Sequence, residues 1–155
     1  MRIGKQRDWT SVWIAGVLLA AFASPTIADD AADKEAGKLE GTWKFVSLTV
    51  DGDEAPQEFI KTARWVIQGK RMITGDAKSR FEVDPSKSPK AIDMTGVDGR
   101  GQGKTAQGIY KIEGERLTIC LPGGKGDSPA GRPRPVEFSG GEHMSLVVLE
   151  RIKDE

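Results

Sequence analysis

Short stretches in which apolar and polar residues alternate recur from residue 39 onward, separated by Gly, Pro and Asp turns at intervals of roughly ten residues. Alternation with a period of two places successive side chains on opposite faces of a strand. A series of such segments joined by tight turns is typical of an all-β meander. We therefore predict strands at residues 42–50, 64–68, 71–74, 80–84, 91–95, 105–113, 116–121, 134–139 and 143–152.

Turn positions are indicated by glycine and aspartate, because the sequence contains no Asn. Both residues accept the backbone angles of tight hairpin turns more readily than most others. The predicted turns are Asp51-Gly52, Gly75-Asp76, Glu113-Gly114 and Gly140-Gly141. Residues 55–62 have Pro56 near the start and Phe59 and Ile60 as an apolar pair, which predicts one short helix across an end of the sheet.

Two predicted strands lack clean alternation, and they are the first and the last of the series. The first contains Phe45, Val46 and Leu48, and the last contains the apolar run at residues 146–149. Such strands need apolar cover on both faces. Pairing the first strand with the last would close the sheet and remove its exposed edges. The predicted fold class is all-β: a small antiparallel up-and-down barrel of eight to nine strands with a short helix.

Residues 1–28 have the three-part composition of a secretory signal. A basic start precedes an apolar run at residues 12–23 and small residues at the end of a cleavage motif at residues 26–28. A run of this length is well short of the roughly 20 residues that a membrane-spanning helix needs. We therefore expect a cleaved signal, a mature chain that begins at Asp29, and an extracytoplasmic location, either periplasmic or secreted.

Charge and local composition define the rest of the chain. The 23 basic and 23 acidic side chains give a formal net charge of zero. A nucleic-acid surface needs a basic surplus on one face, so no nucleic-acid partner is predicted. Residues 29–38 are rich in Ala, Asp, Lys and Glu without an apolar stripe, which predicts a flexible N-terminal tether or a frayed helical turn. The barrel domain then covers residues 39–155, with no transmembrane segment after signal cleavage.

The chain is poor in the residues that carry metal and nucleophilic chemistry. His143 is its only imidazole and Cys120 its only thiol. A Cys/His zinc site needs three or four such ligands, and a disulfide needs a second Cys. The acidic turn of Asp51, Asp53 and Glu54 offers too few oxygen ligands for a strong calcium site. The sequence therefore predicts no enzyme, no metal and no cofactor.

Two glycine-rich segments need separate interpretation. Residues 98–105 combine three Gly with Lys104 and approach a phosphate-binding pattern, but that function needs a following helix where a strand is predicted. We therefore predict a plain hairpin loop there.

Residues 122–135 contain four Gly and four Pro, too many for a packed element, and predict a mobile loop. This loop is a candidate lid or a plain solvated connector, and its candidate contacts for an acidic ligand are Lys125, Arg132 and Arg134.

Gly41-Thr42-Trp43 on the first predicted strand, together with Arg151 on the last, resembles the lipocalin pattern. In that pattern the Trp of a Gly-x-Trp motif lies at the closed end of the barrel beneath an Arg from the far end of the sheet. The resemblance implies a structural signature of Gly41, Trp43 and Arg151. Trp43 and Arg151 would then form a cation–π stack.

The mature chain is also similar to a poorly characterised family of exported lipocalin-like domains that is abundant in planctomycetes. The residues that carry this similarity are 39–43, 51–52, 84–90, 92–95, 103–105, 108–110, 117–121 and Arg151. The similarity implies a lipocalin-like barrel outside the cytoplasm. It brings no established activity.

A barrel of eight strands can be hollow or filled. In a hollow barrel the candidate cavity-lining residues are Trp65, Phe81, Tyr110 and Cys120, the last only if its face points inward. The function that we predict is then a non-enzymatic binding module for a small apolar or amphipathic molecule. The alternative is a filled barrel that acts as a protein-interaction, inhibitor or cell-envelope module through its outer surface and the 122–135 loop, with an extracytoplasmic protein as its partner.

Signal cleavage is tested by intact mass spectrometry of the protein recovered from the periplasmic and culture fractions. We expect the mass of residues 29–155, because the small residue Ala28 precedes the predicted cleavage point. An Ala28→Arg variant should retain residues 1–28, since a bulky charged side chain does not suit that position. An exported wild-type protein that still carries residues 1–28 would contradict the prediction.

Overall fold

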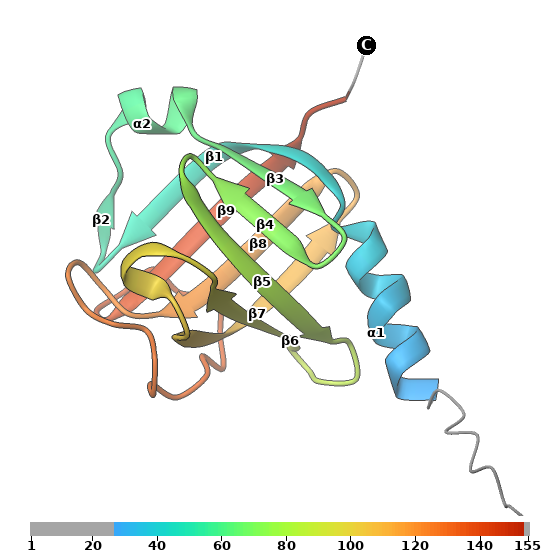
Figure 1. Cartoon of the computed structure of the whole chain (residues 1–155). Coiled ribbons are helices and arrows are strands. Elements are labelled where there is room, and N and C mark those ends of the chain that lie inside the picture. Colours follow the sequence, from blue (N-terminus) through green and yellow to red (C-terminus); the bar gives the residue numbers. More distant parts are fainter. Residues whose placement is uncertain (1–26, 154–155) are drawn as a thin grey trace, which may run out of the picture.

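Within residues 27–153, which the computed structural model describes, nine antiparallel strands form one sheet in which sequence neighbours pair, except that β3 pairs with β1 rather than with β2 (Figure 1). The strands are β1 (Gly41–Val50), β2 (Asp53–Glu54), β3 (Arg64–Gln68), β4 (Arg71–Thr74), β5 (Ala77–Asp84), β6 (Lys90–Gly96), β7 (Thr105–Glu113), β8 (Arg116–Pro122) and β9 (Met144–Arg151). The helical elements are α1 (Ile27–Lys38), α2 (Gln57–Thr62) and the 3₁₀ turn η1 (Gly99–Gly101).

Pairing of the first strand with the last closes the sheet, as predicted. β1 runs antiparallel to β9, from Trp43 opposite Arg151 to Val50 opposite Ser145. The other edge of β1 pairs with β3 and then with the short β2. The prediction of a small antiparallel up-and-down barrel is confirmed: eight strands close it, and β2 is an additional strand within the described residues.

A β-bulge explains the consecutive apolar residues of β1. The register with β9 shifts between Phe45 and Ser47, which makes Val46 an extra residue on β1. Phe45 and Leu48 both pack in the core as a result, although their spacing is three rather than two. Val46 is partly exposed on the outside. The bulge therefore removes the need for apolar cover on both faces of this strand.

Helix α2 confirms the predicted short helix. Its Ile60 is buried, and the ring of Phe59 meets the ring of Phe45 edge to face with centroids 5.5 Å apart. The helix thereby covers the part of β1 beyond its pairing with β3. Among residues 27–153, no helix combines the length and the apolar content needed to cross a bilayer.

Arg151 closes one end of the barrel. Its Cζ lies 4.3 Å from the centre of the Trp43 ring, which confirms the stack implied by the lipocalin resemblance. Arg151 also donates hydrogen bonds to the carbonyl oxygens of Lys38, at 2.6 Å, and of Glu40. Gly41 has a φ of +129°, and a Cβ there would lie 2.8 Å from Nη1 of Arg151, so only glycine leaves room for this side chain.

Residues 29–38, predicted as a flexible tether or a frayed helical turn, instead belong to helix α1. Ala36 is buried in the core, and the buried carboxylate of Glu35 contacts Nζ of Lys38 at 2.8 Å and Nζ of Lys90 at 2.5 Å. Burial by itself raises the pKa of Glu35, but hydrogen bonds from the two lysines outweigh it and hold this pKa below its usual value. A buried ion-paired carboxylate thus docks a helix that lacks an apolar stripe.

The predicted strand at residues 134–139 is wrong, because this segment is irregular. Pro133 and Pro135 have no N–H to donate to a strand ladder. Arg134 instead donates from Nη1 to the carbonyl oxygen of Gly108 at 2.7 Å, which fastens the segment to β7. Alternation in the sequence does not produce a strand where the backbone cannot pair.

The contribution of Arg151 to stability is measurable by urea unfolding. Arg151→Ala should lower the free energy of unfolding by about 1–3 kcal/mol, because it removes the stack on Trp43 and two carbonyl hydrogen bonds. The matched control is Arg116→Ala, which changes an exposed arginine at the start of β8. Equal losses in the two variants would contradict the special role of Arg151.

Candidate functional site

The end of the barrel opposite α1 is hollowed by a pocket of about 530 Å³. In Figure 1 the η1 loop (yellow) and the long connection between β8 and β9 (orange) lie at this end of the barrel. The floor of this open-end pocket consists of side chains and backbone from β5, β6, β7 and β8. These floor residues are Ser79, Met94, Gly96, Ala106 and Leu121.

A gradient in side-chain size along the strands creates the open-end pocket. On the inward face of β7, the large Tyr110 at the α1 end is followed toward the pocket by the small residues Gly108 and Ala106. A Cβ at Gly108 would lie only 2.6 Å from the backbone carbonyl oxygen of Cys120, so this position admits no larger residue without a shift of the backbone. Large inward residues fill the α1 end of the barrel, whereas the small residues Ser79, Gly96 and Ala106 leave space beside Met94 and Leu121 at the other end.

The η1 loop forms a fixed wall of the pocket. Gly96 donates to the carbonyl oxygen of Lys104 at 3.1 Å, and Gly103 donates to the carbonyl oxygen of Gly96 at 2.9 Å. A Cβ at Gly96 would lie 2.2 Å from the carbonyl oxygen of Gly101, so the loop packs directly against the backbone of β6. Strand β7 follows this loop, which confirms the plain hairpin loop and excludes the helix that a P-loop needs.

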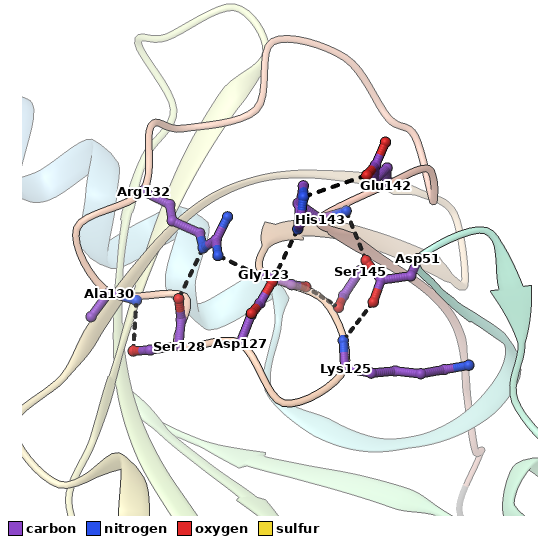
Figure 2. A network of polar contacts seen from close by, with 10 residues as sticks. All are labelled: Asp51, Gly123, Lys125, Asp127, Ser128, Ala130, Arg132, Glu142, His143 and Ser145. Carbon is purple, nitrogen blue, oxygen red and sulfur yellow. Dashed lines mark hydrogen bonds and ion pairs between the residues drawn. The ribbon is translucent and has the colours of Figure 1, made fainter.

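The opposite wall belongs to residues 123–143, which Asp51 fastens to the barrel (Figure 2). The Asp51 carboxylate accepts hydrogen bonds from the backbone N–H groups of Lys125 and His143, each at 2.7 Å. These two hydrogen bonds hold the pKa of Asp51 below its usual value. Ser145 adds a hydrogen bond from its hydroxyl to the carbonyl oxygen of Gly123 at 2.8 Å.

An ion-pair network lies at the rim of the pocket within the same segment (Figure 2). Oδ2 of Asp127 lies 3.0 Å from Nδ1 of His143 and 3.1 Å from Nη2 of Arg132. The other ring nitrogen of His143, Nε2, lies 3.6 Å from a carboxylate oxygen of Glu142. Both ring nitrogens therefore face carboxylates, whereas activation of a nucleophile requires a base within hydrogen-bonding reach of a hydroxyl or thiol.

The acidic turn before α2 has a structural role. Asp51 binds the backbone of residues 123–143, and Asp53 accepts a hydrogen bond from Nζ of Lys125 at 2.7 Å. In the described part of the chain, no group of three or more His, Cys, Asp or Glu side chains is arranged to hold a metal ion.

The aromatic residues predicted to line a cavity lie in the core. Trp65, Phe81 and Tyr110 are all buried within the hydrophobic cluster, and none of them lines the open-end pocket. The edge of Trp65 meets the ring of Phe45 with centroids 5.6 Å apart. The hydroxyl of Tyr110 donates to Glu35 at 3.2 Å. These side chains fill the half of the barrel next to α1.

Cys120 does not line the interior, because its side chain lies on the outer face of β8. It pairs in register with Ile109 and Leu146, whereas the neighbouring Ile119 belongs to the core cluster. The thiol is nevertheless buried, and its Sγ donates to the carbonyl oxygen of Ser139 at 3.3 Å. Burial raises the pKa of the Cys120 thiol, which favours the neutral, unreactive form.

The three cations predicted as loop contacts each form an ion pair within the protein. Lys125 pairs with Asp53, Arg132 with Asp127, and Arg134 with Asp93 at 2.8 Å. These contacts tie residues 123–143 to themselves and to the barrel. Contact of these three cations with an acidic ligand stays a prediction.

No family model, curated protein or solved structure matches this chain. The case for a site rests on geometry alone. Sequence reasoning missed Met94, Ala106 and Leu121 because it searched for large aromatic lining residues. The available signal for Ala106 was a small inward position, together with Ser79 and Gly96 on the neighbouring strands, whereas Met94 and Leu121 carried no such signal.

The role of Asp51 is testable by amide hydrogen exchange. Asp51→Ala should speed exchange at the amides of Lys125 and His143, because both lose their acceptor. The control Asp53→Ala removes only an exposed side-chain pair and should leave both amides protected. Since the folded pKa of Asp51 is lowered, the protection should be complete above the ordinary Asp pKa and be lost as the pH falls through the lowered folded value. Unchanged exchange in Asp51→Ala would contradict this account.

Proposed function

We propose that this protein is an exported, non-enzymatic lipocalin-like module that binds a small apolar or amphipathic molecule in the open-end pocket. The observation that carries the proposal is the pocket itself, which has a volume of about 530 Å³ and is lined by residues from β5, β6, β7 and β8 and from two loops. This volume lies within the range of roughly 300–1,000 Å³ that is typical of small-molecule sites.

The chemistry of the floor supports an apolar guest. Met94, Ala106 and Leu121 present apolar atoms, and covering such surface contributes about 25 cal/mol for each Å² removed from water. Because side chains fill the α1 end, the guest reaches only the outer part of the interior. A compact molecule or one end of a longer chain suits this shape.

The surroundings of the two residues with nucleophilic or base chemistry support a non-enzymatic role. His143 faces carboxylates through both ring nitrogens, and the Cys120 thiol is buried on the outer face of β8. Catalysis by either residue requires a base and a nucleophile within reach of each other and of a substrate.

A second candidate is a module that acts through its outer surface and residues 122–135. Val136, just after that loop, is 82% exposed, and the barrel is packed at its α1 end. An exposed apolar residue of this kind suits contact with an extracytoplasmic protein partner.

Native mass spectrometry of the protein purified gently from its own cells separates the two candidates. An adduct of discrete mass that is lost on denaturation is expected for a ligand-binding barrel. A mass that corresponds to the protein alone, even at low activation energy, would contradict the binding module and favour the outer surface.

The pocket floor is tested with the neutral fluorescent probe N-phenyl-1-naphthylamine. Ala106→Leu should weaken its binding by about tenfold, because the added side chain occupies the pocket. The matched control is Gln107→Leu, which places the same side chain at the adjacent exposed position of β7. Equal binding of the probe to wild type and Ala106→Leu would contradict the site, and circular dichroism of each variant confirms that the barrel is intact.

A further inference from the structure

Two cations on the η1 wall of the open-end pocket have no side-chain partner among residues 27–153. Arg100 and Lys104 both line the pocket and are exposed. Neither side chain has a hydrogen bond or ion pair with any residue in the described part of the chain. They differ in this respect from Arg132 and Arg134, whose charges are satisfied by Asp127 and Asp93.

The negative charge on the facing wall is already satisfied. Asp127 is the carboxylate among the lining residues, and it is paired with Arg132 and His143. It is therefore not placed as the counter-ion of Arg100 or Lys104. The pocket combines an apolar floor with an uncompensated positive charge at its rim.

The loop that carries these cations is fixed before any ligand arrives. Its backbone hydrogen bonds to Gly96 and its direct packing against β6 hold residues 97–104 in place. A preorganised site loses less conformational entropy on binding. An anion at the rim would also lie beside apolar surface, where attraction between opposite charges is stronger than in bulk water.

We infer that the ligand of the open-end pocket is an amphipathic anion, whose apolar part covers Met94, Ala106 and Leu121 and whose oxyanion pairs with Arg100 and Lys104. This inference rests on the proposed function and adds the charge of the ligand to it. A purely ionic ligand leaves the apolar floor exposed, and a neutral one leaves both cations unpaired. A compact acyl chain with a terminal carboxylate covers the apolar floor and also pairs with the two cations.

The test is isothermal titration calorimetry of the full chain as cells produce it, with three probes below their micelle concentrations. Dodecanoate carries both the chain and the charge, dodecanol carries the chain alone, and acetate carries the charge alone. We expect dodecanoate to bind about tenfold or more tightly than dodecanol, as for a charge-assisted contact, and acetate not to bind measurably.

Variants assign the charge preference to the two cations. In Arg100→Gln/Lys104→Gln, the affinity for dodecanoate should fall to that for dodecanol, and the affinity for dodecanol should not change. Arg100→Lys/Lys104→Arg should keep the preference, because it keeps both charges. The control Arg116→Gln/Lys34→Gln removes two exposed cations remote from the pocket and should also keep it.

The outcomes separate the inference from the proposed function. Equal binding of dodecanoate and dodecanol, unaltered in the double glutamine variant, would overturn the anion inference and leave an apolar binding module standing. No binding of either chain would overturn the proposed function and the inference together. Loss of dodecanol binding in the double glutamine variant would also overturn the inference, because the cations would then support the loop rather than the anion.

Discussion

The contact between Arg151 and Trp43 determines which end of this barrel is closed. Its guanidinium lies over the indole and donates to carbonyl oxygens just after α1, groups that a helix end otherwise leaves without partners. Because β1 and β9 also pair at this point, one side chain joins the first strand, the last strand and the N-terminal helix. The absence of a side chain at Gly41 makes the contact geometrically possible.

One end of the barrel is closed, and the pocket lies at the other end. Large side chains such as Tyr110 and Trp43 fill the barrel next to α1, where Glu35 and its lysine partners complete the packing. Toward the opposite end the inward positions include the small residues Ser79, Gly96 and Ala106, and two loops surround the resulting space. Backbone hydrogen bonds to Gly96 hold one loop, and the Asp51 carboxylate holds the other. The pocket is therefore a fixed feature of the fold.

Much of the fold follows from the sequence, because alternation and turn residues act locally. The strands at residues 64–68, 71–74 and 105–113 have the predicted bounds, and closure through β1 and β9 follows from their position in the series. The failures come from interactions that are distant in sequence. Glu35 docks α1 through Lys90, and Arg134 binds Gly108, and neither contact leaves a local pattern.

The site was less predictable than the fold for a similar reason. A pocket forms where inward-facing side chains are small. Once the inward face of each strand is known, Ala106 and Gly96 therefore indicate the site as well as an aromatic residue would. The orientation of Cys120 depends on the register of β8 with its neighbours, which the sequence alone leaves open. The free charges of Arg100 and Lys104 become significant only when the partners of the other cations are known.

The central claim is that the barrel is filled at the Trp43 end and receives its ligand at the other. It is tested most directly by nuclear magnetic resonance during titration with dodecanoate. The account predicts saturable shifts of the methyl groups of Met94, Ala106 and Leu121, while the indole N–H of Trp43, which donates to the carbonyl oxygen of Leu39, does not move. Shifts at the Trp43 indole with unmoved methyl groups at the pocket floor would contradict it.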